Sequence, residues 1–479
     1  MGTFADRYFA NDPAQLKLAR TLYQGAAQLP LVCPHGHVDP HLFADTDYHF
    51  GNPVELMILP DHYVLRVLHS HGVDYADLGI PEVGKPAPQR DPRGVWQIFA
   101  DHFYLYAATP TGIWIQNELT DVFGIAEPLN GRNAQAVYTA VQQALSGADF
   151  TPRKLYNRFN ITVLSTTDGA SDDLALHRQI KASGWEGHIL PTFRADTIVN
   201  IDAAAWVGEV EKLGSASHIQ IGSYAQFIQA VESRRAWFVE NGATATDLAV
   251  VEAITADVPA AEMERLFQKG LARSITAAET NRFISGMLME LARMSSEDGL
   301  VMQLHVGSLR NHDRALFEKY GPDLGADFPI TVEFTRALQP LLNRYGNHPN
   351  FHLILFTLDE ATYSRELAPL ASYYPAVKLG PPWWFHDNLN GMQRFFEQAV
   401  DSGGLFNTVG FNDDTRAFLS IPARHDVWRR AGANWLAGLT LRGVVEENTA
   451  EMMMKALSCG LALQAYKLEE YAPKEARLA

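Results

Sequence analysis

Eight short apolar runs recur along the chain, each followed by a turn or a helical pattern. They cover residues 31–36, 161–166, 188–193, 248–253, 301–306, 352–357, 376–381 and 407–412. Most are apolar at consecutive positions, which is typical of strands covered on both faces in a parallel sheet. From the second run onward, helical patterns fill most gaps, most clearly at residues 260–272 and 281–294. Eight strands alternating with helices predict a (β/α)8 barrel, the TIM-barrel fold of the α/β class.

The first gap is too long for one crossover helix. Residues 40–150 are therefore predicted to form a mainly helical insertion after strand 1, with helices at residues 94–108 and 134–149. Residues 1–39 then hold an N-terminal segment and the first barrel strand, and residues 151–440 hold the remainder of the barrel. Residues 441–479, which include ENTAEMMMKALSCGLALQAY, are predicted to form a C-terminal helical extension.

The composition is that of an acidic globular protein. The 479 residues include 39 Lys and Arg against 55 Asp and Glu, a formal net charge of -16. This charge disfavours nucleic acids and anionic membranes as partners, although a local cluster of Arg and His could bind an anionic substrate. No apolar run reaches the roughly 20 residues that span a membrane. There is no signal-peptide pattern, and Cys33 and Cys459 make no disulfide framework, so we expect a cytoplasmic protein.

The first apolar run ends in a candidate metal site. In LPLVCPHGHVDPHLF (29–43), strand alternation would place Cys33, His35 and His37 on one face, with the histidines at the C-terminal end. In a barrel that end is the catalytic mouth, and two imidazoles at this spacing can bind one divalent metal ion. The alternative is that both histidines are ordinary hydrogen-bonded residues. Cys33 lies one layer deeper and is expected to pack in the core.

Two acidic residues follow the last apolar run. NTVGFNDDTR (407–416) places Asp413 and Asp414 at the mouth of strand 8, across the closure from strand 1. One of these carboxylates could reach a metal held by His35 and His37. The alternative is that one of them caps the helix that follows.

Six segments occur along the chain in a fixed order. They are HGHVDP (35–40), DHYVLR (61–66), PTFRAD (191–196), QLHVGSLRN (303–311), WWFHDNLNGM (383–392) and DTRAFLSIPARHD (414–426). With them the chain resembles the uronate (glucuronate) isomerases, a divergent branch of the amidohydrolase superfamily, over nearly its whole length. The resemblance implies a metal-bearing (β/α)8 barrel with a helical insertion after strand 1.

The resemblance also implies roles for the mouth residues. His35 and His37 match the metal-binding pair of the family, and Asp414 matches the aspartate of its Asp-Ser-Arg motif, a metal ligand and proton carrier. Thr415 replaces the serine and keeps the hydroxyl, and Arg416 matches the arginine that polarises substrate oxygens. The implied cofactor is one divalent metal ion, with zinc as the expected metal. The implied catalytic residues are Asp414, Arg416, Tyr63 and His62.

Substrate contacts are implied for three more side chains. His62 and Tyr63 match a His-Tyr pair that closes over the substrate, and Arg194 matches an arginine that binds the uronate carboxylate. The implied reaction interconverts D-glucuronate and D-fructuronate, with D-galacturonate and D-tagaturonate as a second pair, through an enediol-like intermediate. The alternatives are an ordinary surface ion pair for Arg194 and simple packing of the insertion for His62 and Tyr63.

Some points stay open in the sequence. His305 ends strand 5, where many amidohydrolases place a metal ligand, and the resemblance does not decide whether it binds metal. Trp383 and Trp384 could wall a sugar pocket or fill the core. The chain departs from the usual family pattern with TTDGASDD (166–173) and IQNEL (115–119), which bears on substrate preference.

Two other functions compete with the isomerase. A metal-dependent hydrolase of the amidohydrolase type would activate water at the same site. A non-catalytic sugar-acid-binding barrel would need a disabled site, whereas the His pair and Asp-Thr-Arg are all present. The expected partner is a small sugar acid, and a homo-oligomer is compatible with the sequence. The choice between glucuronate and galacturonate is not determined by it.

Overall fold

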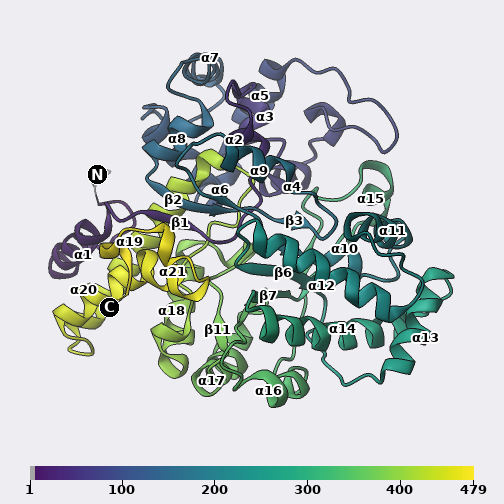
Figure 1. Ribbon diagram of the computed structural model, residues 1–479. Coiled ribbons are helices and arrows are strands. Elements are labelled where there is room, and N and C mark those ends of the chain that lie inside the picture. Colours follow the sequence, from purple (N-terminus) through teal and green to yellow (C-terminus); the bar gives the residue numbers. More distant parts are fainter. Residues whose placement is uncertain (1–5, 479) are drawn as a thin grey trace.

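The structure is a computed structural model that describes residues 6–478. Parallel strands surrounded by helices form the centre of the protein (Figure 1). One sheet has the order β1 (Leu31–Cys33), β2 (Ile161–Ser165), β4 (Ile189–Leu190). The other has the order β11 (Val377–Leu379), β10 (Leu353–Thr357), β7 (Val301–Val306), β6 (Ala245–Val250), β5 (Phe193–Arg194), β3 (Asp168–Gly169). The chain is thus an α/β protein with parallel sheets, as the apolar runs predict.

Two interrupted strands connect the sheets, because β2 and β4 belong to the first sheet and their continuations β3 and β5 belong to the second. β3 follows β2 closely in the chain and β5 follows β4, so pairing runs in chain order from β1 through β2/β3, β4/β5, β6 and β7 to β10 and β11. Seven of the eight predicted runs overlap a strand, but the predicted strand at 407–412 is wrong. There a single parallel bridge joins Thr408 to Leu379, and Gly410 takes a φ of 73°, which regular strands do not adopt. Further on, the His37 N–H donates to the Thr415 carbonyl at 3.0 Å.

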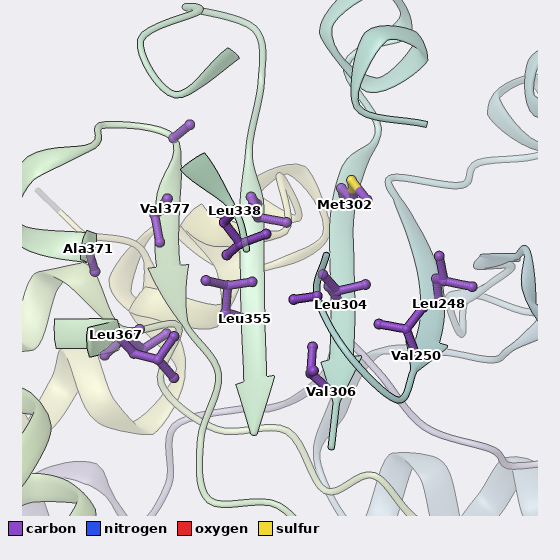
Figure 2. Close-up of a cluster of buried hydrophobic side chains, with 14 of the residues drawn as sticks. Leu248, Val250, Met302, Leu304, Val306, Leu338, Leu355, Leu367, Ala371 and Val377 are labelled. Atoms are coloured by element: carbon purple, nitrogen blue, oxygen red, sulfur yellow. The ribbon is translucent and has the colours of Figure 1, made fainter. Parts of the chain in front are cut away.

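The strands are apolar at consecutive positions because both of their faces are covered. Met302, Leu304 and Val306 of β7 belong to a core shared with Leu248 and Val250 of β6 (Figure 2). Leu338, Leu367 and Ala371 add side chains from flanking helical segments to this core. Each buried apolar Å² contributes about 25 cal/mol, which explains why the outward positions of these strands are apolar.

The alternate positions form a second core inside the sheets. Ala245 and Val301, the first residues of β6 and β7, cluster there with Val32 of β1. The C-terminal segment packs against this cluster, and the hydroxyl of Tyr466 donates to Oε1 of Gln303 at 3.0 Å. This segment follows α20 (Glu447–Lys455) and consists of the π-helical turn η9 (Ala456–Gly460), α21 (Leu461–Ala465) and the residues after it as far as 476. The end of the chain therefore covers part of the inner face.

Residues 40–150, all within the described part of the chain, are helical and contain no strand. The helices are α2 (His41–Ala44), α3 (Pro53–Met57), α4 (His62–Ser70), α5 (Pro92–Asp101), α6 (Pro110–Asn117) and α7 (Ala134–Leu145). They gather on one side of the strands in Figure 1. Local sequence explains how α5 starts, since Pro92 occupies its first position and the Asp91 carboxylate accepts from the Arg93 N–H at 3.1 Å.

The remaining helices lie mostly outside the strands. They are α1 (Pro13–Ala26), α8 (Pro152–Arg158), α9 (Ala175–Ala182), α10 (Asp196–Val199), α11 (Trp206–Ser217), α12 (Tyr224–Glu240), α13 (Ala260–Leu271), α14 (Ala277–Asp298), α15 (Arg314–Tyr320), α16 (Gln339–Tyr345), α17 (Ala368–Tyr373), α18 (Leu389–Gly403) and α19 (Ile421–Leu441). A short antiparallel hairpin joins β8 (Ser308–Leu309) to β9 (Phe328–Pro329). Across residues 6–478, no helix has both the length and the apolar character needed to cross a membrane.

Candidate active site

The two histidines of HGHVDP lie in a loop. β1 ends at Cys33, earlier than the predicted end at residue 36, so strand alternation does not orient His35 and His37. Both still approach one carboxylate, because Oδ1 of Asp414 lies 3.5 Å from Nε2 of His35 and 3.1 Å from Nε2 of His37. Nδ1 of His37 is hydrogen-bonded to Oγ1 of Thr167 at 2.5 Å, which orients the ring. The structure therefore brings the three predicted metal ligands together.

His305 joins this group from the end of β7. Val301 faces the inner core, and alternation along the strand carries His305 to the same face. His35, His305 and Asp414 each offer one ligand atom within 4.8 Å of the others. On the far side of the ring, Nδ1 of His305 lies 2.9 Å from Oδ1 of Asp247 on β6. A carboxylate only accepts, so Nδ1 carries the proton and Nε2 keeps its lone pair for a metal.

The unpaired atoms of this group fit a divalent metal ion. Within residues 6–478, Nε2 of His305 is buried without a hydrogen-bond partner, and Oδ1 of Asp414 is buried close to the His35 and His37 nitrogens but without a hydrogen bond of good geometry. An unpaired buried polar atom costs about 1–3 kcal/mol, and a shared cation would satisfy both. Imidazole nitrogens and carboxylate oxygens are ligands of zinc and related ions. Burial acts to raise the pKa of Asp414, but His35 and His37 hold this pKa well below its usual range, so the carboxylate is ionised.

Asp414 lies in an uncommon backbone conformation next to a second aspartate. Its φ is 38°, in the left-handed region that few non-glycine residues adopt. Asp413 turns away into the core, where it is 1% exposed with Oδ2 3.3 Å from Nε2 of His425. Cys33 is buried beside the same nitrogen, at 3.9 Å, as expected for a core residue. The helix-capping alternative for the two aspartates is wrong, because α19 starts after Ser420 without a side-chain cap.

A cavity of about 210 Å³ lies beside Asp414 and is lined by His62 and Tyr63. Both come from the first turn of α4, whose N-cap Asp61 accepts from the Tyr63 N–H at 2.8 Å. Burial, with Arg416 nearby, lowers the pKa of His62 to about 4. Burial also raises the pKa of Tyr63 well above its ordinary value. At neutral pH the imidazole is therefore uncharged and the phenol keeps its proton.

Arg194, at the end of β5, lines the same cavity. Its Nε lies 3.2 Å from Oδ2 of Asp196 and 3.4 Å from Oδ2 of Asp247. Its side chain is 28% exposed, so its ion pairs lie within the site and not on the open surface. Because Asp247 also contacts His305, one buried carboxylate connects the arginine with the candidate metal ligands.

The segment between β8 and β9 (residues 310–327) covers part of the cavity. Its Asp323 forms an ion pair with Arg416, which comes from a later part of the chain. NH2 of Arg416 lies 3.0 Å from Oδ2 of Asp323, and Arg310 pairs with Asp327 at 3.1 Å; all four residues line the cavity. The segment packs tightly on α4 at Gly325, where φ is 86° and a Cβ would lie 2.7 Å from the His62 carbonyl oxygen. Only glycine allows this approach between the two elements.

Two aromatic side chains and one arginine complete the surroundings. Trp384 lines the cavity with its ring 5.5 Å from that of His62, whereas Trp383 is 5% exposed and packs 4.8 Å from the ring of His305. Trp384 therefore forms part of the cavity wall, whereas Trp383 fills the core. Arg424 also lines the cavity, and it is buried with its guanidinium carbon 3.6 Å from the ring centroid of Trp114.

Comparison with known proteins identifies relatives over nearly the whole chain. A model of the glucuronate isomerase family matches residues 1–462. The chain belongs to the glucuronate isomerase family. It is 51% identical over 464 residues to the uronate isomerase of Nostoc punctiforme, covering 97% of this chain and 98% of that protein. The recognition from the six sequence segments is therefore confirmed.

Solved structures agree with this assignment. The glucuronate isomerase from Caulobacter crescentus matches with a TM-score of 0.96 and 43% identity, covering 99% of both chains. The uronate isomerase from Thermotoga maritima matches with a TM-score of 0.90 and 26% identity, covering 97% of this chain and 100% of that one. The arrangement of helices and strands is thus shared with these two proteins over nearly the full length of the chain.

Several cavity residues of this family member were not assigned from the sequence, among them Arg310, Asp323 and Arg424. Arg310 lies inside QLHVGSLRN and Arg424 inside DTRAFLSIPARHD, so membership in these segments could have indicated both. Asp323 lies in none of the six segments. Only the return of residues 310–327 over the cavity brings its carboxylate to Arg416.

Proposed function

We propose that this chain is an isomerase that interconverts D-glucuronate and D-fructuronate, with D-galacturonate and D-tagaturonate as a second pair. The observation that carries the proposal is the presence of Asp414, Tyr63, Arg194 and Arg416 in one cavity. The similarity to the uronate isomerase of Nostoc punctiforme supports the reaction class. An aldose–ketose isomerase needs a base for the carbon proton and groups that stabilise charge on oxygen.

Asp414 removes the proton from C2 of the open-chain aldose and returns it to C1, while the C2 hydroxyl proton moves to the C1 oxygen. The lowered pKa of Asp414 keeps this carboxylate in the ionised form, which is the form that acts as the base. Tyr63 and Arg416 donate hydrogen bonds to the substrate oxygens on which charge develops in the enediol-like intermediate. Neutral His62, whose ring centroid lies 4.3 Å from that of Tyr63, provides a further hydrogen-bonding group.

Arg194 binds the carboxylate of the uronate and orients the open-chain sugar. Asp196 and Asp247 hold its Nε, so the two terminal nitrogens of the guanidinium remain for a bidentate contact. The surrounding protein is strongly acidic, with a net charge of -16, so this local cation is needed to attract an anionic sugar.

His35, His37, His305 and Asp414 would hold one divalent metal ion. Zinc suits a ligand set of imidazoles and one carboxylate. When bound, the ion supplies positive charge that stabilises negative charge on substrate oxygens. The unpaired Nε2 of His305, and the close approach of His35 and His37 to Oδ1 of Asp414, support this assignment.

We further propose that the strands close into a (β/α)8 barrel in which residues 407–412, joined to β11 by one parallel bridge, take the position of the eighth strand. Its parts are residues 1–39 (N-terminal segment and first strand), 40–150 (helical insertion), 151–440 (remainder of the barrel) and 441–479 (C-terminal extension). The pairing of strands in chain order and the hydrogen bond from His37 to Thr415 support the closure. A homo-oligomer and a cytoplasmic location belong to the same proposal, and the free, buried Cys33 and Cys459 are in keeping with a reducing compartment.

One assay distinguishes this function from its two competitors. The purified protein should convert D-glucuronate to its ketose, lose activity after dialysis against a chelator, and regain it with zinc. A metal-dependent hydrolase would cleave an amide or ester and form no ketose. A non-catalytic sugar-acid-binding barrel would bind the uronate and leave it unchanged. If no ketose forms after zinc has been restored, the proposed function is wrong.

A further inference from the structure

A second cavity, of about 450 Å³, lies next to the catalytic cavity. Its walls come from the end of β6 (residues 249–252), from β8 and from α14. Arg310 lines both cavities. Asp196 lines the second cavity and binds Arg194, which lines the first. Arg310 and the ion pair between Arg194 and Asp196 therefore lie between the two cavities.

The buried side of the second cavity carries an unsatisfied hydroxyl. Ser308 is 7% exposed and lines the cavity, and its Oγ has no hydrogen-bond partner among residues 6–478. An unpaired buried hydroxyl is costly and would be satisfied by a ligand that brings a hydroxyl of its own. Asn200 and Asn281 add amide groups to the lining, and Arg310 adds a positive charge, one nitrogen of which already pairs with Asp327.

The mouth of the second cavity combines apolar side chains with the exposed Glu252 and Asn281. Val251, Ile254 and Leu309 line it with exposed fractions of 48%, 43% and 42%. Sites for small molecules typically measure about 300–1,000 Å³ and combine apolar walls with a few placed polar groups. At about 450 Å³ this cavity falls in that range, whereas the catalytic cavity, at about 210 Å³, is smaller.

We propose that the second cavity binds another molecule of the sugar acid, with its carboxylate at Arg310 and a hydroxyl at Ser308. The inference rests on the proposed function, which makes sugar acids the ligands of the adjoining cavity. An apolar ligand would leave Ser308 unpaired, and a compact dianion would be repelled by the carboxylates of Asp196 and Glu252, which both line the cavity. A monoanionic polyol satisfies the hydroxyl, the amides and the guanidinium together.

Equilibrium dialysis with radiolabelled D-glucuronate tests this stoichiometry even while the enzyme turns over, because the label counts aldose and ketose alike. The intact protein should bind two labelled molecules per chain at saturation. Asn281→Trp, which fills the mouth from an exposed position on α14, should bind one and keep its kcat. The matched control Asn448→Trp, exposed on α20, should still bind two.

Ser308→Val provides a second measurement that does not depend on the tryptophan fitting the mouth. It should weaken the second binding event by about tenfold, the scale of one buried hydrogen bond, and leave the first event unchanged. One labelled molecule on the intact protein, or two on Asn281→Trp, would overturn the second site while ketose still forms. Absence of ketose in the dialysis chamber would instead contradict the proposed function itself.

Discussion

Asp247 and His305 form a buried pair, with Oδ1 of Asp247 2.9 Å from Nδ1 of His305 and exposed fractions of 2% and 5%. Oδ2 of the same carboxylate lies 3.4 Å from Nε of Arg194. Burial acts to raise the pKa of Asp247, but His305, His35 and Arg194 lower it more, so this carboxylate is ionised. One side chain of β6 therefore orients both a candidate metal ligand and the candidate substrate anchor.

Asp247→Asn should weaken metal binding by about 10–100-fold, the usual effect of losing the carboxylate behind a ligating histidine. The amide can present its NH2 group to Nδ1, which disfavours the tautomer that leaves Nε2 free. Competition with a chromophoric chelator measures the change. Asp298→Asn is the matched control, since Asp298 pairs with Arg235 at 2.7 Å and does not line the cavity. Equal metal affinity in both variants would show that Asp247 does not orient His305.

Asp414→Asn should reduce turnover by roughly 10²–10⁴-fold, the usual contribution of a positioned general base. The amide keeps the shape and one oxygen but loses the basicity. Metal content should fall less than turnover because three histidines remain. Both can be followed together by ketose formation, C2 proton exchange with solvent and metal analysis.

Asp413→Asn is the internal control for the assignment of the base. Asp413 is buried against His425 and does not line the cavity, so we expect a lower melting temperature but substantial turnover per folded chain. An inactive, fully folded Asp413 variant beside an active Asp414 variant would place the base one residue earlier. If both variants stay active, an aspartate base is excluded and Tyr63 becomes the leading candidate.

Arg194→Met should raise the KM for uronates by about 10–100-fold, because charge-assisted hydrogen bonds contribute about 1.5–3 kcal/mol. Methionine retains much of the apolar stem, so the fold should persist. The control is Arg178→Met, which removes an exposed arginine that stacks on Trp237 away from the cavity. An unchanged KM in the Arg194 variant would mean that another cation binds the carboxylate.

Asp323→Asn should lower the KM for uronates about two- to tenfold and also lower kcat. The Asp323 carboxylate neutralises Arg416 at 3.0 Å, so its removal leaves more positive charge for an anionic substrate but a less firmly held guanidinium. The pair is nearly half exposed, so the free energy of unfolding should change by less than about 1 kcal/mol. Steady-state kinetics separates the two parameters, and a raised KM with unchanged kcat would contradict this role.

The stability of the protein should depend on pH through Asp426, which binds Arg7 and Arg430 at 2.8 Å each. Burial acts to raise the pKa of Asp426, but Arg430 and Arg7 lower it below 3.8. A lowered folded-state pKa stabilises the fold above the unfolded value, and this contribution disappears as the pH falls through the folded-state pKa. Asp426→Asn should therefore cost about 3–5 kcal/mol at neutral pH.

Thermal melts at several pH values test this sign. The difference in melting temperature between the parent and Asp426→Asn should be largest at neutral pH and should shrink as the pH falls below 3.8. Asp149→Asn serves as the control, because the Asp149 side chain is 94% exposed beside Lys154 and should contribute little at any pH. A difference that grows toward acid pH would contradict the assignment.

Much of the fold could be predicted from the sequence because the relevant signals are local. Seven apolar runs became strands, since consecutive apolar residues reflect burial on both faces of a parallel sheet. Helices such as α7 and α14 follow from their periodicity, and α14 also from its Thr276–Glu279 capping box. The ligand types His35, His37 and Asp414 were likewise visible in short motifs.

The tertiary structure decided two further features of the site. They are the directions of side chains beyond the strand ends and the contacts between segments that are distant in the chain. β1 stops at Cys33, so the loop and Thr167, not strand alternation, orient His37. The backbone at Asp414, with φ at 38°, separates it from its buried neighbour Asp413. The eighth run failed as a strand because a single bridge and a positive-φ glycine replace regular pairing.

The pairing of Asp323 with Arg416, and the second cavity around Ser308, depend on segments that meet only after folding. The sequence by itself therefore determined which elements form and which chemical groups are present, because burial patterns and motifs are encoded over a few neighbouring residues. The tertiary structure alone decided which of those groups face one another, because that depends on packing between residues far apart in the chain.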